Sequence, residues 1–199
     1  ARLPGPQVSL IVGQKIDAVD AAGKNLLIKF DGGLELRTHL GLHGSWHRYR
    51  PGETWRRPPS RAALVLEVPG AVAVCFDAPV VELFERRAEV VHPTISMLGP
   101  DLLGDELDEA EALRRLRDPS RADMAIGEAI LDQRAVAGAG NVYKSEILFM
   151  ERVDPFAPLR SLDAETLGRV LATAREQLQA NARSDAPAGR STTVDLKTG

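Results

Sequence analysis

The stretch that decides the fold reads VAGAGNVYKSEILF and runs from Val136 to Phe149. Gly138 and Gly140 flank one alanine, and Asn141 follows them at the start of a segment whose apolar spacing predicts a helix. Glycines allow a tight turn and let an external group approach the backbone closely. The first turn of a helix offers N–H groups without intrahelical partners and the positive end of the helix dipole. The stretch therefore predicts an anion site, for which phosphate is the common occupant.

Two side chains extend this interpretation, and one alternative stays open. Asn141 offers a donor at the mouth of the helix, and Lys144 adds a positive charge one turn further in. Alternatively, Gly138 and Gly140 only shape a helix–turn–helix corner, and Asn141 caps the helix that follows. Two glycines separated by one residue do not decide between a phosphate site and a corner.

The chain beyond Leu98 has helical periodicity. Helices are predicted at residues 107–116, 126–132, 142–150 and 162–183. Ser161 is the expected N-cap of the last helix. The apolar stripe of that helix consists of Leu167, Val170, Leu171, Ala174 and Leu178.

Residues 8–85 have the pattern of antiparallel strands. Two predicted hairpins turn at Asp31-Gly32-Gly33 and at Pro69-Gly70. Between them, HGSWHRYRPGETWRRPPSR (residues 43–61) is predicted to be a long basic loop. The sequence therefore predicts an α+β protein with an antiparallel β-sandwich at residues 1–90, a helical domain at residues 91–184 and a polar linker at residues 185–199.

Composition and charge limit the classes of function. No apolar run approaches the roughly 18 residues of a membrane span, so no membrane partner is expected. Cys75 is the single cysteine, which rules out a disulfide within these 199 residues and favours a reducing, cytoplasmic setting. The net charge of −3 is unevenly distributed along the chain. Residues 1–64 carry ten Lys/Arg and five Asp/Glu, a net charge of +5, and the remaining residues carry −8. This asymmetry indicates either a polyanion partner for one face or a random surface imbalance.

The histidines do not predict a metal site. Three of them, His39, His43 and His47, are spaced by four residues, which would align them on a helix. They fall instead in predicted strand and loop, and His92 lies far along the chain, so no metal site is expected in residues 1–199.

Two motifs resemble one known family. The run IGEAILDQRAVAGAGNVYKSEILFMERVDP (residues 126–155), with LGPDLL before it, resembles the helix–two-turn–helix domain of the formamidopyrimidine-DNA glycosylase and endonuclease VIII family. Upstream, GKNLLIKF and LRTHLGLHGSW (residues 23–30 and 36–46) resemble the β-sandwich of the same family. The resemblance covers residues 13–183. It implies an enzyme of base-excision repair that removes oxidised bases from DNA and cleaves the abasic site by β-elimination.

The resemblance implies roles for individual residues. Asn141 is expected to bind a phosphate beside the damaged nucleotide, with the amides that follow Gly138 and Gly140. Lys24 is expected to contact phosphate and to donate a proton during strand scission. Leu42 is expected to be the wedge that fills the gap left by an extruded base. The other expected DNA contacts are His43, Lys144, Arg56, Arg57, Arg61 and Arg121.

Each of these residues also has a simpler interpretation. Lys24 could be a solvated lysine at the entry to a strand, and Leu42 could be a core residue. The arginines of the 43–61 segment, together with Trp55, could form an ordinary solvated loop, although basic residues beside an aromatic ring also suit the DNA backbone.

The sequence departs from the family pattern at three places. Family members attack the deoxyribose with the amine of an N-terminal proline, whereas this sequence opens with Ala1 and its Pro4 is not terminal. A four-cysteine zinc finger follows the helical domain in many members. We expect the proline to precede Ala1 and the zinc finger to follow residue 199 in the intact protein, with no cofactor in the residues given. The stretch DAPVV (residues 77–81) lacks the Arg-Phe pair of the oxidised-purine enzymes, which favours the endonuclease VIII branch and oxidised pyrimidines.

The expected partner is damaged double-stranded DNA, bound by a monomer in the bacterial cytoplasm at the nucleoid. The alternative is a non-catalytic nucleic-acid-binding protein that uses the same phosphate loop. A nucleotide-binding metabolic enzyme is disfavoured because a predicted helix, and not a strand, precedes the glycines.

Overall fold

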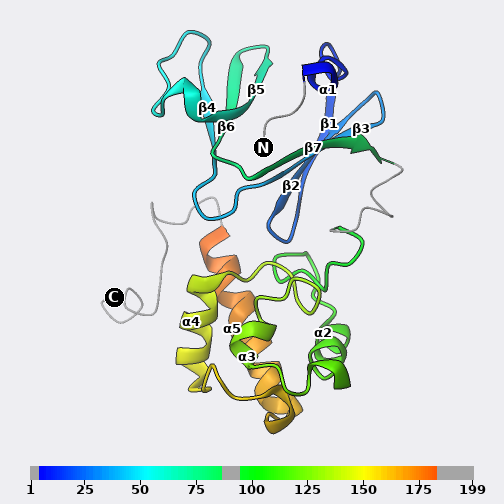
Figure 1. The fold of residues 1–199 in the computed structure, drawn as a ribbon, viewed down its shortest axis with the longest axis vertical. Helices are drawn as coiled ribbons and strands as arrows, with labels where there is room; N and C mark the ends of the chain where they lie inside the picture. Colours follow the sequence, from blue (N-terminus) through cyan, green and yellow to red (C-terminus); the bar gives the residue numbers. More distant parts are fainter. Residues whose placement is uncertain (1–4, 87–94, 183–199) are drawn as a thin grey trace. The chain divides into compact units, whose positions relative to one another are not determined.

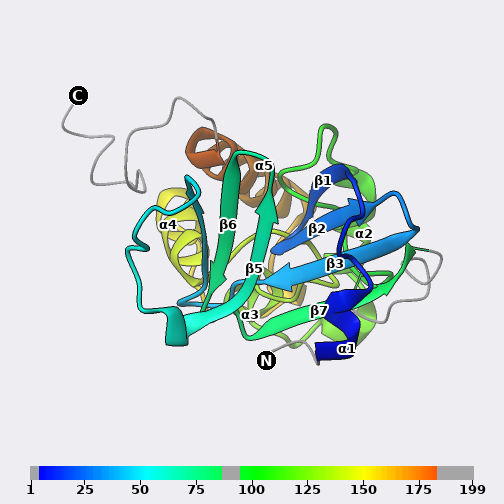
Figure 2. The same ribbon diagram turned by 90° about the horizontal axis from the view of Figure 1, so that it is seen from above.

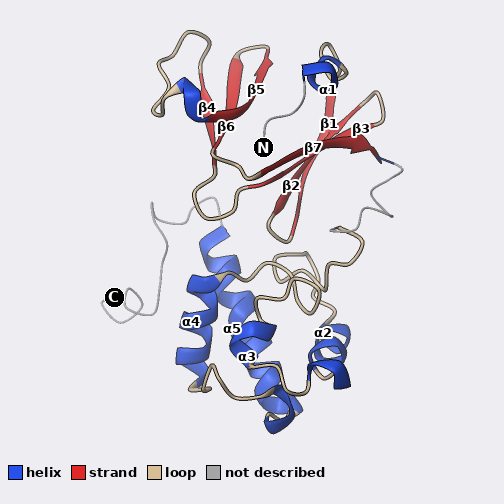
Figure 3. Cartoon of the chain, viewed as in Figure 1, coloured by secondary structure: helices blue, strands red, loops and turns tan. Residues whose placement is uncertain are grey.

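The computed structural model describes residues 5–86 and 95–182, and it divides the chain into two compact units, residues 1–96 and 97–199 (Figure 1). The domain boundary expected at residue 90, the linker expected at residues 185–199, Pro4 and His92 all lie outside the described residues. Within the described part, strands occur in the first unit, and the second is built from helices and loops (Figure 3). No helix of this part has the length and apolarity to cross a bilayer.

Two antiparallel sheets form the first unit, after the short helix α1 (Gly5–Ser9). One sheet has the strand order β1-β2-β3-β7 (Figure 2). The other has the order β4-β6-β5, whose strands are labelled in Figure 1. The strands are β1 (Ile16–Ala22), β2 (Asn25–Phe30), β3 (Leu34–His39), β4 (Ser45–Tyr49), β5 (Ala62–Val68), β6 (Ala71–Phe76) and β7 (Val80–Glu85). The predicted antiparallel β-sandwich is confirmed, with hairpins at the glycine turns of residues 31–33 and 69–70.

The sandwich core lies between the sheets. Ile28 and Leu36 from one sheet pack in one buried cluster with Leu64 and Cys75 from the other. Burial, and after it the Asp77 carboxylate, raises the pKa of the Cys75 thiol to about 11. Cys75 therefore stays protonated and behaves as a small core residue.

The prediction of an unbroken loop at residues 43–61 is wrong, because it contains β4. Trp46 of β4 packs against the core between the sheets. On the opposite face of the strand, the His47 ring forms two hydrogen bonds. Its Nε2 lies 2.9 Å from Ser45 Oγ, and its Nδ1 lies 3.0 Å from the Tyr49 hydroxyl. This alternation has the period of a strand, but Arg48 within β4 and Arg50 just after it hid the pattern. A second cluster of Tyr49, Val74 and Phe76, covered by Trp55, closes that face.

The second unit surrounds one helical core. Its elements are α2 (Glu109–Leu116), η3 (Pro119–Arg121), α3 (Ile126–Ala129), α4 (Asn141–Glu151), η4 (Leu159–Ser161) and α5 (Ala164–Ala182). The five residues predicted as the apolar stripe of the last helix are all buried in α5, which confirms that prediction. α5 packs against α2 and α4.

Several helix ends differ from the prediction, and at two of them local hydrogen bonds give the reason. α5 begins at Ala164 and is capped by Asp163, whose Oδ1 accepts from the Thr166 amide at 2.8 Å. Ser161 instead donates its hydroxyl to the Pro158 carbonyl within the preceding turn (2.7 Å), so its expected capping role is wrong. α3 ends at Ala129, and the Asp132 carboxylate accepts from the backbone of Arg134, which supports a turn there.

Shortening Leu171 tests the helical core. Leu171 is 1% exposed, so Leu171→Ala is expected to destabilise the second unit by about 2–5 kcal/mol through lost burial and a residual cavity. Urea unfolding followed by helical circular dichroism measures this loss. Glu176→Ala, an exposed change on the same helix, is expected to alter stability by less than about 0.5 kcal/mol. Equal effects of the two variants would contradict the assigned core.

Candidate nucleic-acid interface

A glutamine clamps the glycine loop that precedes α4. The Gln133 side chain accepts from the Gly138 amide through Oε1 (3.0 Å) and donates to the Ala139 carbonyl through Nε2 (3.2 Å). Gly138 has a φ of +110°, which L side chains rarely adopt. Gly140 is extended, with a φ of −128°. The loop is therefore fixed before the helix begins, by a residue that no sequence pattern indicated.

The first turn of α4 is exposed. Gly140 is its N-cap and makes no side-chain capping bond, and Asn141 is the first helical residue. The alternative in which Asn141 caps this helix is therefore wrong. The first backbone bond of the helix runs from the Lys144 amide to the Gly140 carbonyl at 2.8 Å.

Two amides at this helix end are available to a ligand. Asn141 and Val142 are exposed, and within residues 5–86 and 95–182 no acceptor is found for the amide of either one. Ala139, whose amide was also expected to help, is fully buried. The anion-binding capacity thus lies in the first turn of α4, and not in the preceding loop.

Lys144 adds positive charge to the same helix end. Its Nζ lies 3.5 Å from Asn141 Oδ1, so the ammonium group and the amide side chain are neighbours on one surface of α4. A phosphate held by the backbone amides would meet both groups.

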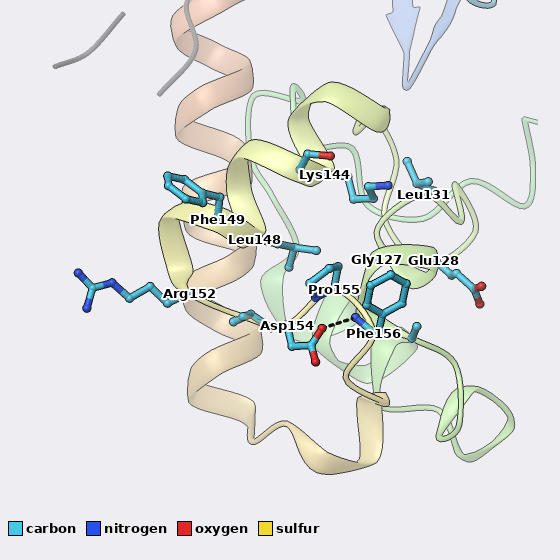
Figure 4. Close-up of a pocket in the computed structure, with 13 residues that line it drawn as sticks. Gly127, Glu128, Leu131, Lys144, Leu148, Phe149, Arg152, Asp154, Pro155 and Phe156 are labelled. Atoms are coloured by element: carbon cyan, nitrogen blue, oxygen red, sulfur yellow. Dashed lines mark hydrogen bonds between the residues drawn. The ribbon is translucent and has the colours of Figure 1, made fainter. Parts of the chain in front are cut away.

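A pocket of about 640 Å³ lies further along α4 (Figure 4). Lys144 and Ser145 are among the residues that line it, as are the exposed Phe149 and Phe156. Phe156 is held by its amide, which donates to Asp154 Oδ1 at 2.9 Å. The apolar wall does not suit a phosphate, so the candidate anion site is the helix end beside this pocket.

Arg121 braces the turn that leads into the glycine loop. Its Nη2 donates to Asp132 Oδ2 at 3.0 Å, and the side chain is 19% exposed. Burial opposes ionisation of Asp132, but the bonds from the Arg134 amide and the Arg121 guanidinium outweigh it and lower the pKa of Asp132. Because Arg121 is engaged in this way, the expected phosphate contact of Arg121 has the least structural support.

Lys24 lies in the turn between β1 and β2 of the first unit. Burial lowers the pKa of Lys24 below its ordinary value of 10.5. Lys24 is only partly exposed at this strand entry, so the alternative of a solvated lysine fits its position but not its burial. A partly desolvated ammonium group is also a better proton donor near neutral pH than an exposed one.

Leu42 lies in a tight exposed loop, Gly41–Gly44, and its side chain is 87% exposed. The alternative of a core residue is therefore wrong. The Gly44 amide donates to the Leu40 carbonyl (2.8 Å) and closes the loop. At its start, the Gly41 amide donates to His39 Nδ1 at 3.2 Å, which requires that this nitrogen carry no proton.

The His39 ring suits that acceptor role. Burial, followed by the charges of Arg37 and Lys24, lowers the pKa of His39. The imidazole therefore stays neutral at physiological pH and can hold the start of the Gly41–Gly44 loop.

The three arginines that follow Trp55 have different environments. Arg57 and Arg61 both form ion pairs with Asp77, at 2.8 and 2.7 Å. Arg56 donates its backbone amide to the Tyr49 hydroxyl (3.1 Å), and its exposed side chain has no partner in the part of the chain that the structure describes. Among the three, Arg56 is the one whose charge is available to an external phosphate.

No group of three or more His, Cys, Asp or Glu side chains within the described residues could hold a metal ion. The absence of a metal site from the whole of residues 1–199 stays a prediction.

Comparison with family models places both units in one group. Residues 3–79 match the model described as the formamidopyrimidine-DNA glycosylase N-terminal domain. Residues 98–193 match the formamidopyrimidine-DNA glycosylase H2TH domain, where H2TH denotes the helix–two-turn–helix fold. The exposed end of α4 lies within the second match.

Individual proteins agree with the family models. The chain is 38% identical over 193 residues to the probable endonuclease 8 2 of Streptomyces coelicolor, covering 96% of this chain and 67% of that protein. It is 34% identical over 199 residues to the DNA-(apurinic or apyrimidinic site) lyase Nei2 of Mycolicibacterium smegmatis, covering 100% of this chain and 73% of that protein. The chain thus spans about two thirds of the length of these relatives.

A solved structure shares the fold. The match is to wild-type Lactococcus lactis Fpg (MutM) in complex with DNA containing N7-benzyl-Fapy-dG, with a TM-score of 0.75. It covers 92% of this chain and 67% of that one at 20% sequence identity, a level at which the likeness concerns the fold alone.

Proposed function

Because the chain belongs to the formamidopyrimidine-DNA glycosylase and endonuclease VIII family, we propose that it acts in base-excision repair as a DNA glycosylase with abasic-site lyase activity. The observation that carries the proposal is the exposed first turn of α4, with two available amides beside Asn141 and Lys144. The proposed partner is damaged double-stranded DNA bound by a monomer, with Asn141 on a phosphate near the lesion.

The proposed base release and strand scission use side chains of the first unit. A base within a duplex is out of reach, so it must rotate out of the stack, and Leu42 would fill the gap with His43 beside it. An amine then attacks C1′ of the deoxyribose and displaces the base, and the resulting Schiff base permits elimination of the 3′ phosphate. Lys24 would contact phosphate and supply the proton for this elimination. No residue of 1–199 is assigned as the amine, since the family uses an N-terminal proline.

The proposed substrate is an oxidised pyrimidine. Residues 77–81 lack the Arg-Phe pair that the resemblance assigns to oxidised-purine enzymes. The similarity to the probable endonuclease 8 2 of Streptomyces coelicolor supports the same branch. Comparison of release rates for an oxidised pyrimidine and an oxidised purine in otherwise identical duplexes tests this preference, and faster purine release would contradict it.

The lowered pKa of Lys24 gives the strand-scission step a pH dependence. The step needs the protonated amine, so its rate is expected to fall as pH rises through a pKa that lies below 10.5. Lys24→Arg keeps its charge at alkaline pH but gives up no proton, so we expect slower scission at every pH and no such decline. The measurement is the pH–rate profile of strand scission on a duplex with a preformed abasic site. Identical profiles for the two proteins would remove Lys24 from the proton-transfer step.

Borohydride trapping tests the proposal as a whole. The protein expressed from its complete reading frame is expected to form a covalent adduct with an abasic duplex in the presence of borohydride, because the reagent reduces a Schiff base. Tight DNA binding without an adduct would refute the lyase and favour the alternative, a non-catalytic nucleic-acid-binding protein with the same phosphate loop.

A further inference from the structure

Asp77 is a strained junction at the end of β6. Its φ is +52°, an uncommon conformation for a residue other than glycine. Its backbone amide donates to the Arg61 carbonyl at 3.0 Å. Its carboxylate accepts from Arg61 Nε at 2.9 Å and from Arg57 Nη1 at 2.8 Å. Such strain persists only where the surrounding contacts hold it, and here two guanidinium groups do so.

Arg57 connects this junction to the loop that carries Leu42. The same Nη1 atom that binds Asp77 also donates to the His43 carbonyl at 3.2 Å. The contact is made to the loop backbone at the peptide between His43 and Gly44, one residue beyond Leu42, and not merely to a side chain.

The segment after Asp77 also supports the loop directly. Gly41 has a φ of +59°, and a Cβ added there would lie 2.9 Å from Pro79 Cγ. A Cβ at Gly44 would lie 2.3 Å from the Leu40 carbonyl oxygen, across the hydrogen bond that closes the loop. Three contacts therefore hold the loop. The Gly44 amide binds the Leu40 carbonyl, Gly41 lies against Pro79, and Arg57 binds the His43 carbonyl.

We propose that Asp77, acting through Arg57, positions the Gly41–Gly44 loop so that Leu42 can enter the base stack. This positioning role rests on the proposed function. Arg61 holds the carboxylate in place, and the direct phosphate contact of this region falls to Arg56. The bonds from Arg61 and then Arg57 lower the pKa of Asp77, so the carboxylate stays ionised throughout the physiological range.

The test uses a duplex with a tetrahydrofuran abasic-site analogue and 2-aminopurine in the base pair beside it. The fluorescence of 2-aminopurine rises when a wedge disrupts its stacking. In Arg57→Gln and Asp77→Asn we expect most of this rise to be lost, and base release from a lesion duplex to slow by about tenfold. Asparagine tolerates the positive φ of residue 77, so Asp77→Asn removes the charge without changing the backbone preference.

The controls separate a positioning role from a phosphate contact. Arg56→Gln is expected to reduce the salt dependence of binding by about one unit and to leave the fluorescence rise intact. Arg48→Gln, an equal charge change at an exposed residue of β4, is expected to affect neither the fluorescence rise nor base release. Adding Arg57→Gln to Leu42→Ala is expected to cause no further loss of fluorescence, because both changes remove the same event.

The outcomes are distinguishable. A normal fluorescence rise in Arg57→Gln, with a reduced salt dependence like that of Arg56→Gln, would overturn the positioning role. A fluorescence rise that depends on Leu42 and Arg57, in a protein that releases no base, would support the positioning role and refute the glycosylase instead. Intrinsic fluorescence of Trp46 and Trp55, which pack against two clusters of the first unit, checks that each variant keeps the fold of this unit.

Discussion

Leu42→Ala is expected to leave binding to undamaged duplex unchanged and to slow base release by about ten- to a hundredfold. Leu42 is 87% exposed, so its removal costs the fold little. Burying a leucine side chain contributes about 1.5–3 kcal/mol, and this contribution is made only when the side chain replaces an extruded base. Single-turnover base release from a lesion duplex measures the effect.

Leu10→Ala is the matched control, since Leu10 is another exposed leucine of the first unit (56%). We expect this variant to release the base at the unaltered rate. If both variants release it at that rate, Leu42 is not a wedge. If Leu42→Ala weakens binding to undamaged DNA equally, Leu42 makes a general contact and has no role in base extrusion.

Asn141→Ala is expected to weaken binding to every duplex by about tenfold or more, because a hydrogen bond to a charged group contributes about 1.5–3 kcal/mol. The loss should not depend on the sequence or on the lesion, since phosphates carry no sequence information. Equilibrium titration of several duplexes at a series of salt concentrations measures it. Unchanged affinity at every salt concentration would mean that Gly138 and Gly140 only shape the turn between two helices and that no phosphate binds there.

Asn141→Asp separates binding from helix stability. A carboxylate in the first turn favours a helix through its dipole, so α4 is expected to stay intact. The same carboxylate repels phosphate, so DNA affinity should fall further than in the alanine variant. Ser145→Ala, one turn along α4, is expected to bind DNA normally. A purely structural role of Asn141 would instead let the aspartate variant bind as well as the native protein.

The architecture was largely predictable because it depends on local patterns. The hairpins follow from glycine turns at residues 31–33 and 69–70 between apolar runs, and α5 follows from a continuous stripe. β4 was missed because Arg48 and Arg50 interrupt the apolar residues around it. In β4 the apolar Trp46 lies on one face, and Ser45, His47 and Tyr49 lie on the other. These residues do not form the simple apolar–polar alternation by which a strand is recognised in sequence.

Only the part of the site that is formed by residues close together in sequence was predictable. The exposed amides of α4 follow from two glycines before a helix, and the structure adds that Asn141 opens the helix and does not cap it. Gln133 was missed because a glutamine five residues before a glycine has no particular meaning in sequence.

The Asp77 junction was missed for a different reason. It joins residues 57, 61 and 77, which only the sheet brings together. The sequence therefore did not reveal that Arg57 and Arg61 form ion pairs with Asp77, and their contacts with DNA stay a prediction.

The most direct test of the phosphate contact is a cycle that removes each partner in turn. Neutral methylphosphonates are placed singly along both strands near an abasic-site analogue, and affinities are measured for the native protein and for Asn141→Ala. At one phosphate the two losses are expected to be far from additive, with Asn141→Ala losing little more once the charge is gone. Additive losses at every phosphate would contradict a contact between the end of α4 and the DNA backbone.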